Sequence, residues 1–310
     1  MTAVLSITFP IFVLIAAGYV AFRRNVLQPD HARGLGAFVL NFALPALIVR
    51  ALAGRPASEI FNAPYLAAYG GASLVVFALV FGVARYARGR GLTESAMQAL
   101  GATASNSGFV GYPVAALVLG QIAGVALSLN MMFENFILIP LALALGEAGK
   151  GEARGLAENL RATLLRLARN PLILAIVAGS AISLSGAALP TPLGRAIDML
   201  ANASAAVALF AIGGALVGLS AEGLAADVAL VVAGKLILHP LAVFAALALA
   251  PPFDPELRKA ALVFSSVPMI TVFPLLAGAY GQERMAAAAL LSATAAAFFT
   301  ISAMLYFVQG

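Results

Sequence analysis

Residues 99–121 form an apolar segment that is interrupted near its middle, and they read ALGATASNSGFVGYPVAALVLGQ. The interruption gathers small polar residues, glycines and one proline: Thr103, Ser105, Asn106, Ser107, Gly108, Gly111 and Pro113. Pro113 removes a backbone donor and clashes with the preceding turn, and the glycines weaken the helix further. Small polar side chains can satisfy the backbone groups that are freed in this way inside a membrane. The segment therefore predicts a membrane helix that is broken near its centre.

A second apolar segment, residues 261–282, has the same kind of interruption and reads ALVFSSVPMITVFPLLAGAYGQ. Its polar and proline residues are Ser265, Ser266, Pro268, Thr271 and Pro274. Two broken helices at corresponding positions are typical of a transporter binding site, because each break leaves a half-helix whose N-terminal amides favour an anion. The alternative is that these prolines and glycines are packing and kink residues, which are common in membrane helices.

The composition excludes an ordinary soluble domain. Of the 310 residues, 62% are hydrophobic and only 10% are charged, and the mean hydropathy is +1.00; a soluble domain carries about 25% charged residues. The chain has no cysteine, and His31 and His239 stand in no metal-binding spacing, so we expect no metal site and no cofactor. We also find no metalloprotease motif and no nucleotide-binding glycine loop, so the sequence does not predict an enzyme.

Ten apolar runs meet the length needed to cross a bilayer, which is about 20 residues in a helix. They are residues 5–22, 34–53, 64–84, 97–120, 122–145, 171–188, 197–219, 226–250, 258–280 and 285–308. Because only helices satisfy every backbone group within such runs, we predict an all-α membrane protein of about ten transmembrane helices. Most Lys and Arg residues between the runs fall in the odd-numbered loops. The positive-inside rule then predicts a multi-pass protein of the cell membrane with both termini on the non-cytoplasmic side.

The two halves of the chain resemble each other at a constant offset of 161 residues. The matching pairs are Pro10 and Pro171, Gly18 and Gly179, Pro29 and Pro190, Asn41 and Asn202, Pro113 and Pro274, Gly120 and Gly281, and Gln121 and Gln282. Each half holds five predicted spans, an odd number, so the second half enters the membrane from the opposite side. We therefore predict two inverted five-helix repeats, residues 1–148 and 171–310. The cytoplasmic linker between them, 149–170, is either an amphipathic helix on the membrane surface or a solvated connection.

Three short motifs carry a resemblance to a known family. They are Asn106-Ser-Gly-Phe-Val-Gly-Tyr-Pro113 followed by Gly120, Asn41-Phe-Ala-Leu-Pro45, and Lys235-Leu-Ile-Leu-His-Pro240. The chain resembles the auxin efflux carrier family, and its short central loop is similar to that of bacterial members, which include malonate and other organic-acid transporters. The resemblance implies a scaffold of the first, second, sixth and seventh spans. It also implies a transport domain of the third to fifth and eighth to tenth spans that moves like an elevator.

The same resemblance implies roles for single residues. Asn106 matches the family's substrate-facing asparagine, and Pro113 and Pro274 match the prolines at which the two broken helices cross. The candidate substrate-binding residues are Asn106, Ser105, Ser107, Gly108, Asn41, Ser266 and Thr271. Asn41 and its repeat-related partner Asn202 either line the scaffold side of this site or hold their two helices together.

Four further polar residues lie deep in predicted spans: Asn130, Glu134, Lys235 and His239. A charge at that depth is expensive and needs a partner. Lys235 is either a structural cation, paired for example with Glu134, or a functional one that contacts a substrate carboxylate or the carbonyls of a half-helix. Glu134 is the candidate carrier of a coupling proton, with hydrogen bonding between helices as its alternative, shared with Asn130. We interpret His239 as a hydrogen-bonded packing residue.

Together these features predict a secondary transporter that moves a small organic anion, a carboxylate, by alternating access. The alternative is an anion-selective channel that uses the same broken helices to line a pore. The expected partners are the substrate anion, the lipid bilayer, a coupling proton or sodium ion and, in a homodimer, a second copy of the chain. We expect no nucleic acid partner, because the basic residues form no single face.

Overall fold

A computed structural model describes residues 2–53, 55, 61–151, 164–165, 167–186, 189–218 and 225–309. Within these ranges the regular structure is helical, apart from one isolated β-bridge. The chain therefore has the all-α fold that its composition predicts. The amphipathic surface helix that is one of the two predictions for the linker 149–170 falls mostly outside the described residues.

The helices lie as follows in chain order. They are α1 (Thr2–Arg23), α2 (Pro29–Phe38), α3 (Leu44–Ala53), α5 (Ala63–Gly82), α6 (Leu92–Thr103), α7 (Tyr112–Leu119), α8 (Ile122–Phe133), α9 (Ile139–Gly149), α11 (Pro171–Ser185), α12 (Thr191–Ala215), α13 (Ala225–Ala233), α14 (His239–Leu249), α15 (Pro255–Ser266), α16 (Phe273–Gly278) and α17 (Glu283–Gln309). Five wider, π-helical turns join some of them end to end: η1 (Val39–Ala43), η2 (Val83–Ala87), η3 (Ser107–Gly111), η4 (Glu134–Leu138) and η5 (Gly234–Leu238).

Six helices among the described residues are long and apolar enough to cross a membrane. They are Asp30–Ala53, Ala63–Ala87, Ile122–Gly149, Thr191–Ala215, Ala225–Leu249 and Glu283–Val308. Shorter apolar helices cover Phe9–Arg23, Ser107–Leu119 and Pro171–Ser185. The protein is thus a multi-pass membrane protein. The expected spans 97–120 and 258–280 are each interrupted, at residues 104–106 and 267–272, where the polar and proline residues lie.

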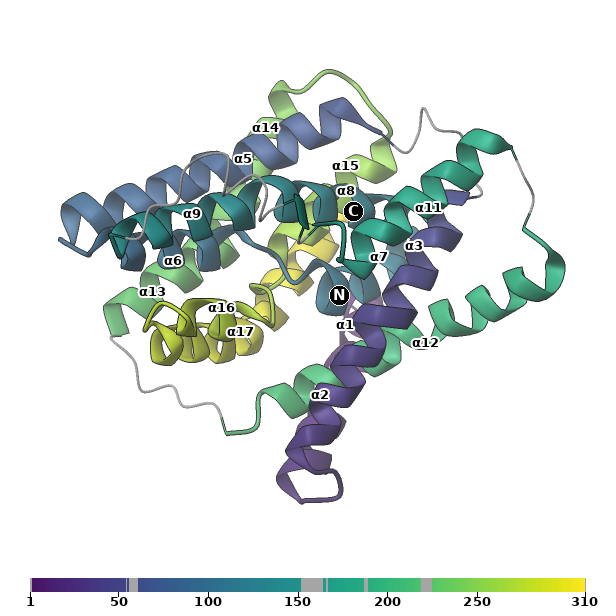
Figure 1. Cartoon of the computed structure of the whole chain (residues 1–310), viewed down its shortest axis with the longest axis horizontal. Coiled ribbons are helices and arrows are strands. Elements are labelled where there is room, and N and C mark those ends of the chain that lie inside the picture. The colour runs from purple at the N-terminus through teal and green to yellow at the C-terminus, as the bar shows by residue number, and fades with distance from the viewer. Residues whose placement is uncertain are drawn as a thin grey trace.

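The helices pack as two groups. The first group consists of α1, α2, α3, α11 and α12, and α12 contacts three of the others. The second group consists of α5 to α9 and α13 to α17, in which α5 packs on α6 and α14, and α17 packs on α13 and α16. Figure 1 shows α3, α11 and α12 on one side and α5, α6, α9, α13 and α16 on the other. Contacts of α3 with α8 and of α12 with η3 join the two groups.

The first group is held by one very close helix contact. A Cβ atom on Gly18 of α1 would meet the carbonyl oxygen of Phe210, and one on Gly213 of α12 would meet the carbonyl oxygen of Ile15. The two backbones therefore touch, which only glycine allows at these positions. Small residues at such crossings are how membrane helices gain packing contacts without a hydrophobic driving force.

Candidate functional site

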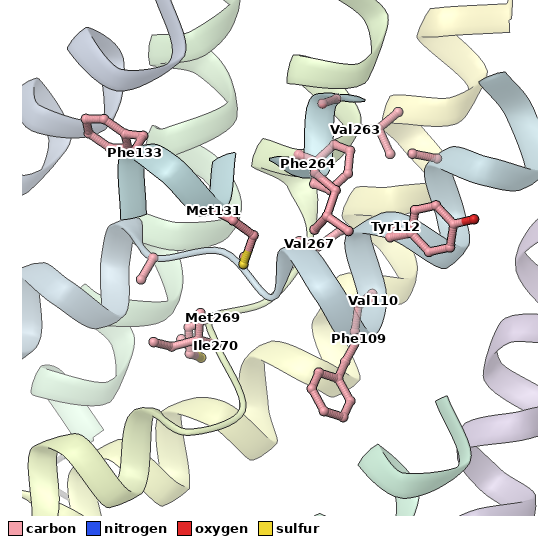
Figure 2. Packing of buried hydrophobic residues seen from close by; sticks show 14 of the residues in the cluster. Phe109, Val110, Tyr112, Met131, Phe133, Val263, Phe264, Val267, Met269 and Ile270 are labelled. Carbon is pink, nitrogen blue, oxygen red and sulfur yellow. The ribbon is translucent and has the colours of Figure 1, made fainter. Parts of the chain in front are cut away.

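The two interrupted helices meet at their breaks. Helix α6 ends at Thr103 and the chain becomes helical again at Ser107, while α15 ends at Ser266 and the next helix begins at Phe273. The non-helical segments between them, residues 104–106 and 267–272, meet in an antiparallel bridge between Ser105 and Met269. We call this pair of segments the crossing. Figure 2 shows apolar side chains around it, among them Met131 and Phe264.

Backbone hydrogen bonds across the crossing replace those that the breaks remove. The amide of Asn106 donates to the carbonyl of Pro268 at 2.8 Å, and the amide of Ile270 donates to the carbonyl of Ala104 at 3.1 Å. Proline has no backbone N–H that needs an acceptor, so Pro268 suits a position where the backbone only accepts a hydrogen bond. The crossing is therefore a short antiparallel contact that pairs some of the backbone groups that the breaks would leave unpaired inside a membrane.

Asn106 joins the two breaks through its side chain. Its Nδ2 donates to Oγ1 of Thr271 at 2.7 Å, and its Oδ1 accepts from the amide of Phe109 at 3.3 Å. Asn106 is thus the cap of the helix that resumes at Ser107, as asparagine commonly is. Only 4% of its surface is exposed. The residue that the family resemblance singles out lies at the centre of the crossing.

Glu134 contacts the crossing from a third segment of chain. It begins η4, in the long helix that α8 and α9 share, and 1% of its surface is exposed. Its Oε1 accepts from the amide of Ser105 at 3.0 Å and from Oγ of Ser107 at 3.3 Å. Its Oε2 has no hydrogen-bond partner in the described part of the chain. A carboxyl group is therefore attached directly to the break in the first helix.

Lys235 contacts the other break. Its Nζ donates to the carbonyl of Ser265 at 2.7 Å and lies 3.0 Å from Nδ1 of His239. The lysine is fully buried, and it lies where α15 ends, which is where a cation is favoured by the helix dipole. No ion pair joins Lys235 to Glu134 among the described residues. Lys235 contacts a half-helix carbonyl instead, and its electrostatic interaction with Glu134 acts without a direct contact.

Two residues of α5 connect these contacts. Oγ of Ser73 lies 2.8 Å from Nε2 of His239 and donates to the carbonyl of Tyr69, whose hydroxyl lies 3.0 Å from Oγ of Ser105. The sequence reasoning missed Tyr69 and Ser73. The sequence feature that could have identified them is the spacing of Tyr65, Tyr69 and Ser73, which are four residues apart and so place three polar groups on one face of an apolar helix.

A cavity of about 180 Å³ lies over the crossing, and we call it the central cavity. It is bounded by the two helix groups, since Leu40, Leu44 and Leu172 line it from the first group. The residues that line it from the second group include Ser105, Asn106, Ser107, Gly108, Glu134, Asn135 and Thr271. Asn170, which caps α11 and donates to Oδ1 of Asn135 at 3.2 Å, completes the polar lining. The sequence reasoning missed Asn170, although an asparagine before a proline is a usual helix start.

Two larger clefts adjoin the central cavity. One of about 620 Å³ shares Phe109 and Thr271 with it and includes Arg33, and one of about 670 Å³ shares Asn170 and Leu172 with it and includes Arg169. Asn41 lines both clefts but not the central cavity, and its Nδ2 donates to the carbonyl of Ala37. The cavity therefore adjoins two clefts whose linings include arginine.

Several expected site residues lie elsewhere. Ser266 donates to the carbonyl of Val263 and lines a separate apolar groove beside Phe244 and Phe307, so it does not reach the central cavity. Asn130 accepts from the hydroxyl of Tyr65 at 3.0 Å and is also outside the cavity lining.

The two repeat-related asparagines do not face each other across the site. Asn202 accepts from Nη1 of Arg50 at 2.7 Å, so it ties α12 to α3. Of the pair, Asn41 alone lies near the candidate site.

The lining of the central cavity is suited to an anion. The backbone amides of Ser107 and Gly108 begin the 13-residue helix Ser107–Leu119 and have no hydrogen-bond partner among the described residues. Such amides, at the positive end of a helix, favour negative charge. A Cβ atom at Gly108 would lie 2.8 Å from Cδ1 of Leu44, so a larger residue there would have to displace the end of that side chain. Among the described residues, no cluster of three or more His, Asp or Glu side chains could hold a metal ion.

A helical membrane fold whose two broken helices meet at a buried polar crossing is typical of membrane transport proteins. The chain belongs to the auxin efflux carrier family, whose description is "membrane transport protein" and which matches residues 3–305. It is 33% identical over 312 residues to the "Putative malonate transporter" of Rhizobium meliloti (strain 1021), which covers 100% of this chain and 97% of that protein. It is 31% identical over 240 residues to the "Uncharacterized transporter YfdV" of Escherichia coli (strain K12), covering 75% and 74% of the two chains. The "Lysosomal cholesterol signaling protein" of Mus musculus is 26% identical over 67% of this chain and 25% of its own length.

Proposed function

We propose that the protein is a secondary transporter that carries a small carboxylate across the cytoplasmic membrane by an elevator-like alternation of access. The observation that carries the proposal is the central cavity, which lies between the two helix groups and has the crossing as its polar floor. Secondary transporters bind their substrates where the broken helices of two repeats meet, and the cavity lining includes residues from the breaks in both halves of the chain. The relative in Rhizobium meliloti, named for malonate, favours a carboxylate.

The size and polarity of the central cavity favour a small anion. Its volume of about 180 Å³ is below the roughly 300–1,000 Å³ that pockets for drug-sized ligands occupy. The amides of Ser107 and Gly108 and the side chain of Asn106 would bind one carboxylate group. Asn135 and Asn170 would bind polar groups at the other end of the same molecule.

The proposed topology has ten crossings, arranged as two inverted repeats of five. The first helix group would be the scaffold, and the second group would move with the bound substrate. With both termini outside, the clefts that include Arg33 and Arg169 open to the cytoplasm, because both arginines fall in odd-numbered loops. The arginines would attract an anion to the cavity from that side.

Replacing Asn106 by alanine tests the binding site. We expect Asn106→Ala to weaken the binding of malonate by about tenfold or more, because a hydrogen bond to a charged group contributes roughly 1.5–3 kcal/mol. The measurement is thermal stabilisation of the purified protein over a malonate titration, with a panel of other small carboxylates beside it. Asn62→Ala is the matched control, because Asn62 also caps a helix with its side chain but lies outside the central cavity.

Two outcomes would contradict the proposal. One is that no carboxylate stabilises the unaltered protein, and the other is that Asn106→Ala and Asn62→Ala bind malonate equally well. Counterflow in proteoliposomes separates a carrier from a channel: internal malonate accelerates the uptake of labelled malonate only when a carrier alternates. Linear, unsaturable flux without counterflow would support a channel.

A further inference from the structure

The position of Glu134 has a consequence for what the proposed site binds. We infer that the anion binds in the central cavity together with one proton, which is carried by the carboxyl group of Glu134. The inference rests on the proposed function and specifies its coupling ion. Two features support it: the charged residues in the cavity lining, and the hydrogen bonds of the two carboxyl oxygens of Glu134.

Glu134 is the charged residue in the described cavity lining, and the cation that interacts with it electrostatically, Lys235, lies outside that lining and forms no ion pair with it among the described residues. Its Oε1 is 3.3 Å from Oγ of Ser107, a residue of the cavity lining whose amide has no hydrogen-bond partner among the described residues. An anion bound to that amide would lie in the range, about 4–6 Å, over which like charges strongly disfavour each other. At this distance each negative group raises the proton affinity of the other, as in paired carboxylates that titrate together. An ionised Glu134 and a bound carboxylate therefore exclude each other.

The hydrogen bonds of Glu134 leave a place for this proton. Both donors, the amide of Ser105 and the hydroxyl of Ser107, approach Oε1, and Oε2 has no partner in the described part of the chain. A proton that arrives from water through the adjoining clefts would bind Oε2. The resulting O–H would donate to an oxygen of the substrate carboxylate. When the carboxylate leaves on the other side of the membrane, the proton leaves Oε2 for water, and the net reaction moves one proton with each anion.

The other titratable groups near Glu134 are already engaged in fixed contacts. On η5 and α14, Lys235 contacts the carbonyl of Ser265 and the ring of His239, whose other nitrogen faces Ser73. On α5, the hydroxyl of Tyr69 faces Ser105 and that of Tyr65 donates to Asn130. The crossing and the first helix group contribute no further titratable side chain to the cavity lining. Glu134 is thus the group whose protonation the substrate would sense directly.

The test is the pH dependence of malonate affinity, measured by calorimetry on the purified full chain between pH 7 and 10, where malonate itself stays fully ionised. We expect the dissociation constant to rise by up to tenfold per pH unit once Glu134 ionises, which is the slope for one linked proton. Glu134→Gln replaces the acid by an amide that still accepts from Ser105 and Ser107, and we expect its affinity not to vary with pH. Ser128→Ala is the control, because Ser128 lies on the same helix and donates only to Gly124.

The outcomes separate the inference from the proposed function. Binding by the unaltered protein that does not change with pH would overturn the inference and leave carboxylate transport intact. An equal pH slope in Glu134→Gln would also overturn it, because another group would then be responsible. Absence of malonate binding at every pH would overturn the proposed function and the inference with it. Should Glu134→Gln fail to fold, the slope of the unaltered protein alone still decides whether a proton is linked.

Discussion

At the scale of single residues, the buried polar groups form one continuous chain of contacts that ties both helix breaks to α5. Its members are Ser265, Lys235, His239, Ser73, Tyr69, Ser105 and Glu134. Buried polar groups in such chains are mutually satisfied, so the loss of one member leaves its neighbours unpaired at a cost. Lys235 matters most here because it is a charge, and because it lies against the open end of α15.

Replacing Lys235 by methionine tests whether this lysine is structural. We expect Lys235→Met to lower the free energy of unfolding by roughly 2–3 kcal/mol, because the carbonyl of Ser265 loses a charged donor. The measurement is thermal unfolding in detergent. Lys259→Met is the control, since Lys259 forms a half-exposed pair with Glu256 and its loss should change stability by less than about 1 kcal/mol. Unchanged stability with abolished malonate binding would show instead that Lys235 contacts the substrate.

The residues of the candidate site were predictable from the sequence only where backbone geometry decides their position. Asn106, Ser107 and Gly108 follow directly from the break before Pro113, and they line the central cavity. Ser266 was also expected in the site but does not line the central cavity, because it ends α15 and its side chain donates back to the carbonyl of Val263. Residue spacing does not give the direction of a side chain at the end of an interrupted helix, since no helical period applies there.

At the scale of helices, the contact between α1 and α12 depends on glycine. We expect Gly213→Leu to destabilise the protein by about 1–3 kcal/mol, because its side chain would enter the backbone of α1 at Ile15 and Tyr19. Gly194→Leu on the same helix is the matched control, because no atom lies within 4 Å of its Cβ position. There we expect unchanged or slightly higher stability, since leucine favours helix over glycine. Melting temperatures in detergent compare the two, and equal values would show that the helices separate at little cost.

The helices themselves were largely predictable, because hydrophobic length and helix-breaking residues are local properties of sequence. The π-helical turns were not. Three of the five lie at the candidate site: η3 follows Asn106, η4 begins at Glu134 and η5 contains Lys235. A widened turn adds a residue without changing an all-apolar pattern, so composition gives no sign of it, although such turns are frequent at functional sites.

At the scale of the whole molecule, polar contacts hold the second helix group together, whereas the first group faces it with mainly apolar side chains. The breaks, Glu134 and Lys235 all belong to the second group, so the polar crossing is internally complete. The first group contributes mainly apolar side chains to the central cavity, such as Leu40 and Leu44. Asn170 donates to Asn135 across this interface, but the other residues with which the first group lines the cavity are apolar, so sliding would break few hydrogen bonds there, which suits the proposed elevator motion.

A thiol cross-link between the groups tests this motion, and the absence of cysteine in the chain gives a clean background. Phe12 of α1 and Phe298 of α17 pack edge to face across the interface, with ring centroids 5.0 Å apart. We expect a short thiol cross-linker to stop malonate transport in the double variant Phe12→Cys, Phe298→Cys, because it fixes α17 to the scaffold. Malonate binding should remain, since neither residue lines the central cavity.

The control for this cross-link is a second edge-to-face phenylalanine pair that lies within the moving group. Phe244 of α14 and Phe307 of α17 have ring centroids 5.6 Å apart. If the second group moves as one body, joining these helices in Phe244→Cys, Phe307→Cys leaves the distance between them unchanged and transport continues. Continued transport after cross-linking both pairs would mean that the groups do not move past each other, as in a channel. Arrest by both would mean that the second group itself must deform.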